Sequence, residues 1–142
     1  MELLLTRLKE EDVISFFRKV TYAFPKLTDE NILYEYARKL SKFAEFVICK
    51  NSKDEVVGMI AFYMNTKPVC YLSFVCVLQE YTRKGIMRQM IENIVKEAKI
   101  RRFCKLKLEV NKGNNIAIKA YESLNFIFES DSERGQYMIL DL

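Results

Sequence analysis

The spacing of hydrophobic residues in the first third of the chain predicts a strand followed by two helices. Residues 3–8 alternate as a short strand. Apolar positions three and four apart then predict a helix from Glu10 to Ala23, which Pro25 ends. A second helix is expected to begin at Thr28, a good N-cap residue. Its predicted buried face consists of Ile32, Tyr36, Leu40 and Phe43.

The middle of the chain reads as three strands. Residues 46–49 and Val56 to Met64 predict a hairpin around a polar turn at residues 51–54. Val69 to Leu78 is a nearly continuous apolar run, which is typical of a strand covered on both faces. We therefore expect this third strand to lie at the centre of the sheet.

The remaining residues predict two more helices, each followed by strand structure. A helical stripe contains Ile86, Met90 and Ile94, and Cys104 to Val110 then alternates as a strand. A further helix opens at residues 113–115, and residues 126–128 and 137–142 read as closing strands. The order β-α-α-β-β-β-α-β-α-β-β predicts one α+β domain over residues 1–142, with a mixed and mostly antiparallel sheet.

Composition supports a globular domain and argues against several partners. Half of the 142 residues are apolar, 30% are charged, and the net charge is +4. This charge is too weak to indicate nucleic-acid binding, and no apolar run approaches the ~18 residues of a membrane span. The four cysteines lie in apolar, strand-like runs and are expected to pack as small hydrophobic residues. The chain has no histidine, so we expect no metal site. The first residues lack the charged start and long apolar stretch of a signal peptide, so we expect a cytoplasmic protein.

The segment from Tyr81 to Arg88 has the features of an anion-binding loop. It joins a buried strand to an amphipathic helix, whose first backbone N–H groups have no partner within the helix. Gly85 permits close approach, and Arg83, Lys84 and Arg88 add positive charge at the same turn. A diphosphate suits this chemistry, although a solvated helix start explains the same residues.

Two motifs of the sequence resemble those of a known family. Residues 77–88 are similar to the acetyl-CoA loop of GNAT (Gcn5-related N-acetyltransferase) enzymes, written Q/R-x-x-G-x-G/A. Residues 108–110, followed by Asn114, Ala117 and the segment 121–126, resemble the family pattern LxV…NxxAxxxYexxGF. The sequence departs from the family where Thr82 replaces Gln or Arg, Met87 replaces Gly or Ala, and Asn125 replaces Gly.

The resemblance implies a three-layer GNAT fold, with about seven strands and about four helices, that binds acetyl-CoA as co-substrate. In that family the strand matching Val75, Cys76 and Val77 pairs with the pantetheine arm through its backbone. The pyrophosphate is held by the residues matching Thr82, Arg83, Lys84, Gly85, Ile86, Met87 and Arg88. Asn114 matches a residue that contacts the cofactor, and it is equally suited to cap a helix.

The same resemblance suggests two catalytic residues. Tyr121 matches the tyrosine that protonates the departing thiolate, while its spacing alone favours packing in the core. Glu109 lies twelve residues before it, as in the glutamate–tyrosine pair of bacterial ribosomal-protein alanine acetyltransferases, and is the candidate base. It would otherwise be a strand residue paired with a lysine. Tyr63, Asn65 and Ser73 are weaker candidates for the acceptor site.

The expected reaction is direct transfer of an acetyl group from acetyl-CoA to an amine. The acceptor would be a protein N-terminus, a small amine or an amino sugar. A covalent route through Cys76 is rejected, because no histidine is present to activate the thiol. Two alternatives remain open: a non-catalytic acyl-CoA-binding domain, and acetylation of a sugar during polysaccharide assembly. Open sheet edges make a homodimer conceivable.

Overall fold

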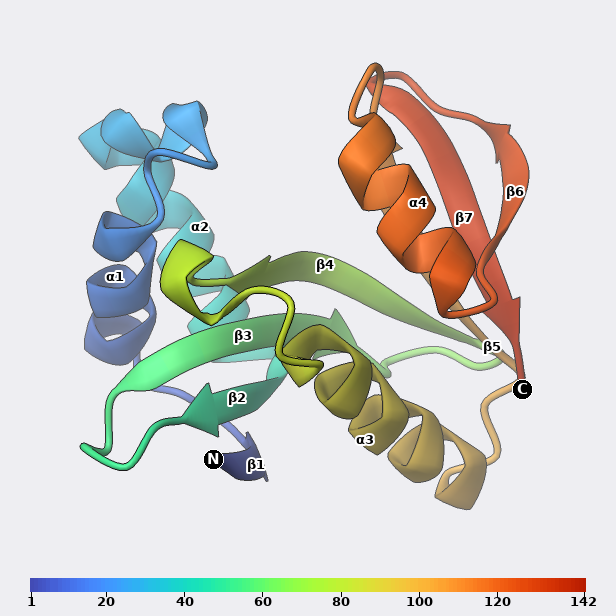
Figure 1. The fold of residues 1–142 in the computed structure, drawn as a ribbon, viewed down its shortest axis with the longest axis horizontal. Helices are drawn as coiled ribbons and strands as arrows, with labels where there is room; N and C mark the ends of the chain where they lie inside the picture. The colour runs from blue at the N-terminus through green and yellow to red at the C-terminus, as the bar shows by residue number, and fades with distance from the viewer.

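A computed structural model describes all residues from Met1 to Leu142. Its elements follow the predicted order, with two short 3₁₀ turns added (Figure 1). They are β1 (Glu2–Thr6), α1 (Glu10–Lys19), η1 (Pro25–Thr28), α2 (Glu30–Phe43), β2 (Glu45–Lys50), β3 (Val56–Tyr63), β4 (Val69–Val77), η2 (Gln79–Tyr81), α3 (Ile86–Ile100), β5 (Lys105–Asn111), α4 (Asn115–Ser123), β6 (Ile127–Asp131) and β7 (Gly135–Asp141).

The strands form one seven-stranded sheet in the order β1-β2-β3-β4-β5-β7-β6. Every neighbouring pair is antiparallel except β4 and β5, which are parallel and joined through α3. This confirms the predicted mixed α+β sheet, and it confirms that the long apolar run forms the central strand. No helix is both long enough and apolar enough to cross a lipid bilayer.

One extra residue in β4 changes which side of the sheet its side chains face. Ala61 pairs with Phe74 and Phe62 pairs with Leu72, so Ser73 is a bulge with no partner of its own in β3. Before the bulge, Leu72 packs in the core beneath α3, whereas after it Phe74 packs in the core beneath α1 and α2. The two halves of one strand therefore contribute to both cores.

The pairing of β4 with β5 is short. It runs from Val69 opposite Lys105 to Leu72 opposite Leu108 and then ends. Beyond this point the two strands diverge, and β5 continues with β7 away from β4 (Figure 1). The sheet thus opens at its centre, between the C-terminal halves of two neighbouring strands.

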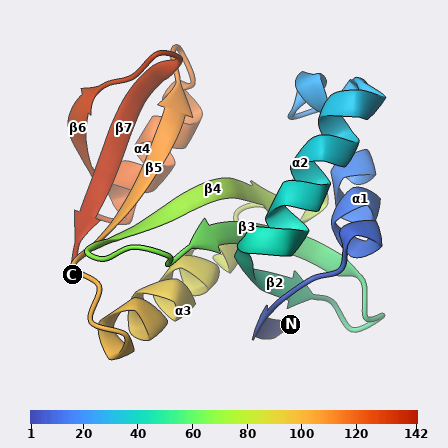
Figure 2. The same cartoon turned by 180° about the vertical axis from the view of Figure 1, so that it is seen from behind.

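Two hydrophobic cores lie on opposite faces of the sheet. One contains the inner faces of α3 and α4, and the other contains those of α1 and α2. Figure 2, seen from behind, shows α1 and α2 over β2–β4, while the same face of β5, β7 and β6 has no helix on it. In the second core the Phe74 ring contacts four other rings, with centroids 4.8 to 6.5 Å away. They belong to Phe16, Phe17, Phe24 and Tyr36.

The first helix is shorter than predicted. It ends at Lys19, and the next residue, Val20, has φ −120° and accepts two hydrogen bonds that close a turn before Pro25. The helix therefore ends about one turn earlier than the apolar spacing implies, and the proline accounts only for Phe24, which leaves the helical conformation at the end of this turn. Val20 and Phe24 still pack inward, which explains why the helical spacing extended beyond the helix.

The second helix is capped by Asp29 rather than by Thr28. The Asp29 carboxylate accepts hydrogen bonds from the backbone of residues 31 and 32, at 2.9 and 3.3 Å. The Thr28 hydroxyl instead donates to the carbonyl of Pro25 at 2.6 Å, closing η1, so it is not available as a cap. The predicted face was also partly wrong: Ile32 and Phe43 are exposed, and the buried residues are Leu33, Ala37 and Leu40.

The cysteines divide unevenly between core and surface. Cys49, Cys70 and Cys76 are buried, as predicted, but Cys104 is exposed. Cys104 precedes β5, in the connection where the chain turns from α3 back to the sheet, so its side chain has no core to enter. Asn125 has φ 73° just after α4, in the left-handed conformation expected where the family has glycine.

Candidate functional site

The loop before α3 presents a run of free backbone donors. Thr82 and Gln89 donate to the carbonyls of Gln79 and Gly85, but the N–H groups of residues 83–88 donate to no group in the protein. Gly85 is the N-cap of α3, with φ 76°, and no side chain caps the helix. This left-handed conformation strains any residue with a Cβ and suits glycine. The loop therefore offers an uncapped helix start, with its dipole facing outward.

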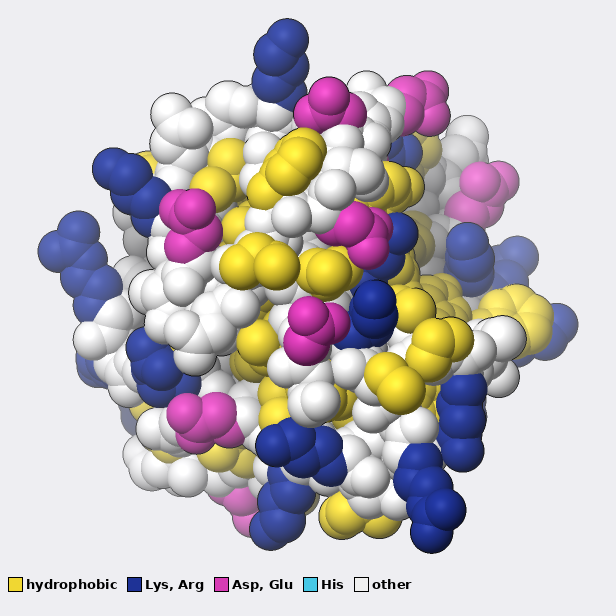
Figure 3. All heavy atoms as spheres, turned by 90° about the vertical axis from the view of Figure 1, so that its right-hand side faces the viewer, with side chains coloured by type: hydrophobic (Ala, Val, Ile, Leu, Met, Phe, Trp, Pro, Cys, Tyr) yellow, Lys and Arg dark blue, Asp and Glu magenta, His cyan; other side chains and the backbone are white.

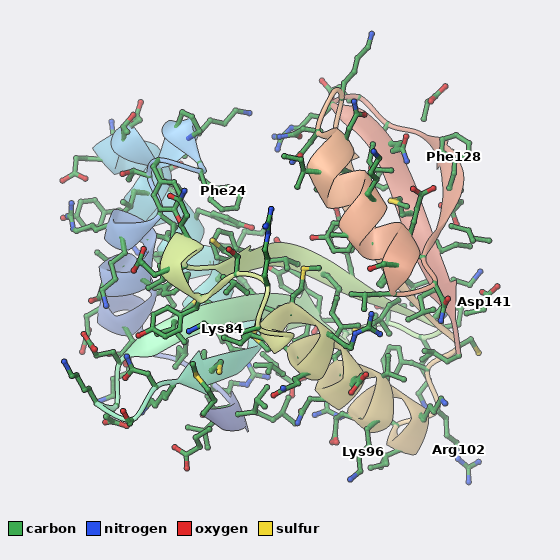
Figure 4. All side chains as sticks on the ribbon, in the orientation of Figure 1. Phe24, Lys84, Lys96, Arg102, Phe128 and Asp141 are labelled. Atoms are coloured by element: carbon green, nitrogen blue, oxygen red, sulfur yellow. The ribbon has the colours of Figure 1, made fainter.

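Positive side chains surround these donors. Arg83, Lys84 and Arg88 are exposed, and none of them forms an ion pair. The Lys84 ammonium lies 5.3 Å from the centre of the Tyr81 ring, and Figure 4 shows Lys84 beside the start of α3. The Tyr81 hydroxyl accepts a hydrogen bond from the Asn51 amide at 3.0 Å, which fixes this ring. The loop thus combines free N–H groups with unpaired cations.

The two unusual residues of this loop do not obstruct it. The Thr82 hydroxyl donates to the carbonyl of Gln79 at 2.9 Å and thereby closes η2. Met87 is partly buried and packs against the core beneath α3, next to the buried Ile86. Because the Met87 side chain turns toward the core, its N–H remains available on the outer side of the helix start.

The diverging half of β4 has a free backbone edge. Leu78 donates to Val57 of β3 at 2.8 Å, so the alternation of an antiparallel pair also directs the backbone groups of Cys76 toward β3. Val75 and Val77 then direct their N–H and C=O groups toward the gap beside β5. Of the three residues predicted to pair with a cofactor, these two carry the free groups.

Asn114 acts as the N-cap of α4. Its side-chain oxygen accepts a hydrogen bond from the N–H of Ala117 at 3.2 Å. The structure therefore contains the capping interaction that the sequence offered as an alternative to cofactor contact. The side-chain amide nitrogen of Asn114 donates to no protein group and stays free for a ligand, while its backbone N–H donates to the carbonyl of Asn111.

Tyr121 projects from α4 into the core beneath α3 and α4. Its ring meets Phe126 edge-on, at 5.6 Å between centroids, and the residue is 9% exposed. Its hydroxyl has no hydrogen-bond partner in the protein. Burial raises the pKa of this phenol well above its ordinary value, and the nearby Cys76 thiol raises it further. The phenol therefore stays protonated at neutral pH and has a proton to donate.

Glu109 lies on the other side of the gap from Tyr121. Its neighbours Leu108 and Val110 belong to the same core as Tyr121, so alternation directs Glu109 to the opposite face. It is the first residue of β5 after the last position paired with β4, and it forms no ion pair. The lysine pairing of the alternative interpretation is absent, because the nearest lysine of β5 on its face, Lys107, pairs with Glu129 at 2.8 Å.

Four tyrosines, three from the sheet and one from α2, lie on the side of the sheet that Glu109 faces, and Tyr71 and Tyr137 were missed in the sequence. Tyr137 lies directly opposite Glu109 in β7, and Tyr63 lies opposite Tyr71 across β3 and β4. The Tyr36 hydroxyl, from α2, lies 3.0 Å from the carbonyl oxygen and 2.7 Å from the hydroxyl of Ser73. We call Tyr36, Tyr63, Tyr71 and Tyr137 the tyrosine cluster.

Only Tyr63 and Ser73 of this region were singled out from the sequence, as weaker acceptor-site candidates. The third such candidate, Asn65, is exposed in the β3–β4 turn, at the other end of β4 from the gap. The signal available in the sequence was a single tyrosine in each of the strands 69–77 and 135–141, Tyr71 and Tyr137. That signal has no meaning until the strands are placed side by side.

Burial sets the protonation of this region. It raises the pKa of Tyr36 to about 12, although the hydrogen bond with Ser73 lowers it. It also raises the pKa of Tyr71, with the Glu109 charge adding to the rise and Arg134 opposing it. Burial raises the pKa of the Cys76 thiol to about 12, so this cysteine is not a thiolate nucleophile at neutral pH.

The sequence matches the model of the Acetyltransferase (GNAT) family over residues 6–126, and the chain belongs to this family. The resemblance stated from the two motifs is therefore confirmed. No curated protein sequence matches the chain.

Solved structures share the fold at low sequence identity. The PaiA N-acetyltransferase of Thermoplasma acidophilum, solved with coenzyme A, is 16% identical, with a TM-score of 0.78 and all of both chains covered. Gcn5 of Tetrahymena is 15% identical, with a TM-score of 0.77 over 99% of this chain and 96% of its own. A GNAT acetyltransferase from Elizabethkingia anophelis, solved with acetyl-CoA bound, is 13% identical, with a TM-score of 0.68 over 76% and 82% of the two chains. These likenesses establish the GNAT fold.

Proposed function

We propose that this protein transfers an acetyl group from acetyl-CoA directly to a primary amine. The observation that carries the proposal is the gap between β4 and β5, with Tyr121 on one face and Glu109 on the other. A thioester in this gap would be open to an acceptor from the Glu109 side. Its sulfur would leave toward the Tyr121 side.

The binding half of the proposal rests on the two sets of free backbone groups. The N–H groups of residues 83–88, together with Arg83 and Arg88, suit a pyrophosphate. Val75 and Val77 suit the amides of a pantetheine arm, which would add to β4 as another strand adds to a sheet edge. Coenzyme A and acetyl-CoA in the related structures support this assignment.

The chemical half follows from the positions of the two side chains. An amine attacks only as the free base, so Glu109, directly or through one water, removes a proton from the ammonium. Glu109 passes that proton to solvent. The amine then adds to the thioester carbonyl, the adduct loses a second proton to Glu109 or to water, and the C–S bond breaks. The Tyr121 phenol is a weaker acid than a thiol, so it acts chiefly as a hydrogen-bond donor to the departing thiolate, which finally takes up one proton.

An amine is favoured over a hydroxyl acceptor because of Glu109. A half-buried carboxylate without a cation partner attracts an ammonium and can deprotonate it. A sugar hydroxyl has a far higher pKa and would need a stronger base than a carboxylate to reach the same state.

Calorimetry with acetyl-CoA, followed by a thiol-release assay on a panel of primary amines, tests the proposal. We expect acetyl-CoA binding that weakens about tenfold in a variant carrying both Arg83→Gln and Arg88→Gln. Lys96→Gln is the matched control, because Lys96 lies toward the far end of α3 (Figure 4). Binding without thiol release on any amine would contradict catalysis, and absence of binding would contradict both halves.

A further inference from the structure

Two opposite charges near the C-terminal end of β5 have no ion-pair partner. Glu109 forms no ion pair, and neither does Arg134, in the β6–β7 turn. Of the two lysines that β5 places on the same face as Glu109, Lys107 is neutralised by Glu129 and lies 4.3 Å from the centre of the Tyr137 ring, and Lys105 lies at the start of the strand, opposite Asp141. Arg134 is an unpaired cation beside the other end of β5, which is the end nearer to Glu109.

The position of Arg134 is fixed by the backbone. Its carbonyl accepts a hydrogen bond from the N–H of Lys112, at 2.8 Å, which ties the turn to the end of β5. The next residue, Gly135, packs so closely that a Cβ there would meet the carbonyl oxygen of Val110 at 2.1 Å. Arg134 opposes the rise in the pKa of Tyr36 and of Tyr71, and Glu109 adds to the rise for Tyr71, so both charges act on the Tyr71 hydroxyl.

The tyrosine cluster includes one unused polar group. The Tyr63 hydroxyl is buried and has no hydrogen-bond partner. A buried hydroxyl without a partner costs about 1–3 kcal/mol, and a polar ligand atom at this position would remove that cost. Tyr71 is half-buried and no cation lies against its ring, which can attract an ammonium, whereas the Tyr137 ring already carries the Lys107 ammonium.

We propose that the acceptor carries an anionic group near its primary amine, with the ammonium at Glu109 and the tyrosine cluster and the anion at Arg134. This inference rests on the proposed acetyl transfer and adds the substrate class. A carboxylate and a phosphate share the required chemistry, so amino acids and phosphorylated amino sugars both belong to the class. A plain alkylamine lacks the second contact.

Two matched pairs of acceptors test the inference: γ-aminobutyrate against butylamine, and glucosamine 6-phosphate against glucosamine. We expect kcat/KM to be about tenfold higher for the anionic member of at least one pair, and the responding pair identifies carboxylate or phosphate. Arg134→Gln should reduce that preference to about twofold, chiefly through KM, and Arg134→Lys should retain part of it. Lys96→Gln should leave the preference unchanged.

The outcomes separate the two proposals. Turnover of the neutral amines as efficiently as of their anionic partners overturns this inference and leaves acetyl transfer intact. An equal loss for both members of a pair in Arg134→Gln also overturns it, because a structural role predicts that result. Failure to acetylate any amine overturns acetyl transfer and this inference together.

Discussion

Tyr121→Phe is a substitution that separates catalysis from folding. The substitution keeps the ring that packs on Phe126 and removes only the hydroxyl, which has no partner in the protein. No intramolecular hydrogen bond is lost, and a largely desolvated hydroxyl is replaced by a hydrogen. We therefore expect the free energy of unfolding to be unchanged, or to rise by up to about 1 kcal/mol.

The cost should fall on the chemical step. A hydrogen bond to a charged group is worth about 1.5–3 kcal/mol, and here it forms with the thiolate that develops as the C–S bond breaks. At about 1.4 kcal/mol per factor of ten, kcat should fall roughly 10- to 150-fold. The acetyl-CoA dissociation constant should change less than threefold or so, because the hydrogen bond is strongest to the transition state and not to the thioester.

Three measurements are needed: kcat from thiol release, the acetyl-CoA dissociation constant from calorimetry, and the melting temperature. Tyr34→Phe is the matched control, since Tyr34 is an exposed α2 tyrosine whose hydroxyl accepts from Arg18 at 2.9 Å. We expect it to leave kcat unchanged. An unaltered kcat in Tyr121→Phe would refute the role of the hydroxyl. A loss of kcat that is matched by a fall in melting temperature would instead indicate a packing role.

Three further changes probe other parts of the structure. Glu109→Gln should lower kcat about 10²-fold with little effect on acetyl-CoA binding, and a normal kcat would leave deprotonation to water alone. Glu45→Gln should cost about 2 kcal/mol in a denaturant titration at pH 7, because Glu45 forms two 2.7 Å bonds with Arg101, which lowers the pKa of this carboxyl. The contribution of this pair is present above the pKa of Glu45 in the unfolded chain and is lost as the pH falls through its pKa in the folded protein. If the wild type and Glu45→Gln differed in unfolding free energy at pH 3 as much as at pH 7, the stabilising role of the charged carboxylate would be contradicted. Gly135→Ala should destabilise the protein, because its Cβ would meet the Val110 carbonyl, and a normal melting temperature would show that the turn can shift.

Much of the fold was predictable because local patterns and tertiary structure agree. Each apolar spacing named an element that exists, and the near-continuous run over residues 69–78 identified the central strand. The errors lie where local interactions compete. Thr28 is a good cap by residue type, but its hydroxyl closes a 3₁₀ turn, so the neighbouring Asp29 caps the helix instead.

The site was predictable only in part, for two physical reasons. A bulge at Ser73 leaves no trace in an apolar run, because residues on both faces are hydrophobic there. The divergence of β4 and β5 is a property of the pair and not of either strand. Arg134 was missed because it lies in a polar turn that the sequence alone cannot place beside β4 and β5. The loop and Tyr121, by contrast, lie within motifs of fixed spacing.

The face of the molecule that includes β6 shows no surface feature that indicates a partner. Figure 3 shows apolar, basic and acidic side chains intermingled on the face that includes β6, and no single charge dominates it. Exposed Ile127 and Phe128 belong to this edge strand, and Glu129 follows them. Figure 4 shows Phe128 at the margin of the molecule, away from the gap.

The opening at the centre of the sheet means that the polypeptide alone is an incomplete structure. Without a ligand, Val75 and Val77 must give their hydrogen bonds to water in the middle of the sheet, where other strands give them to each other. A cofactor that lies along this edge would in effect be an additional strand. Its concentration would then regulate the rigidity of the protein as well as its activity, and amide hydrogen exchange at these two valines would report how often the sheet is complete.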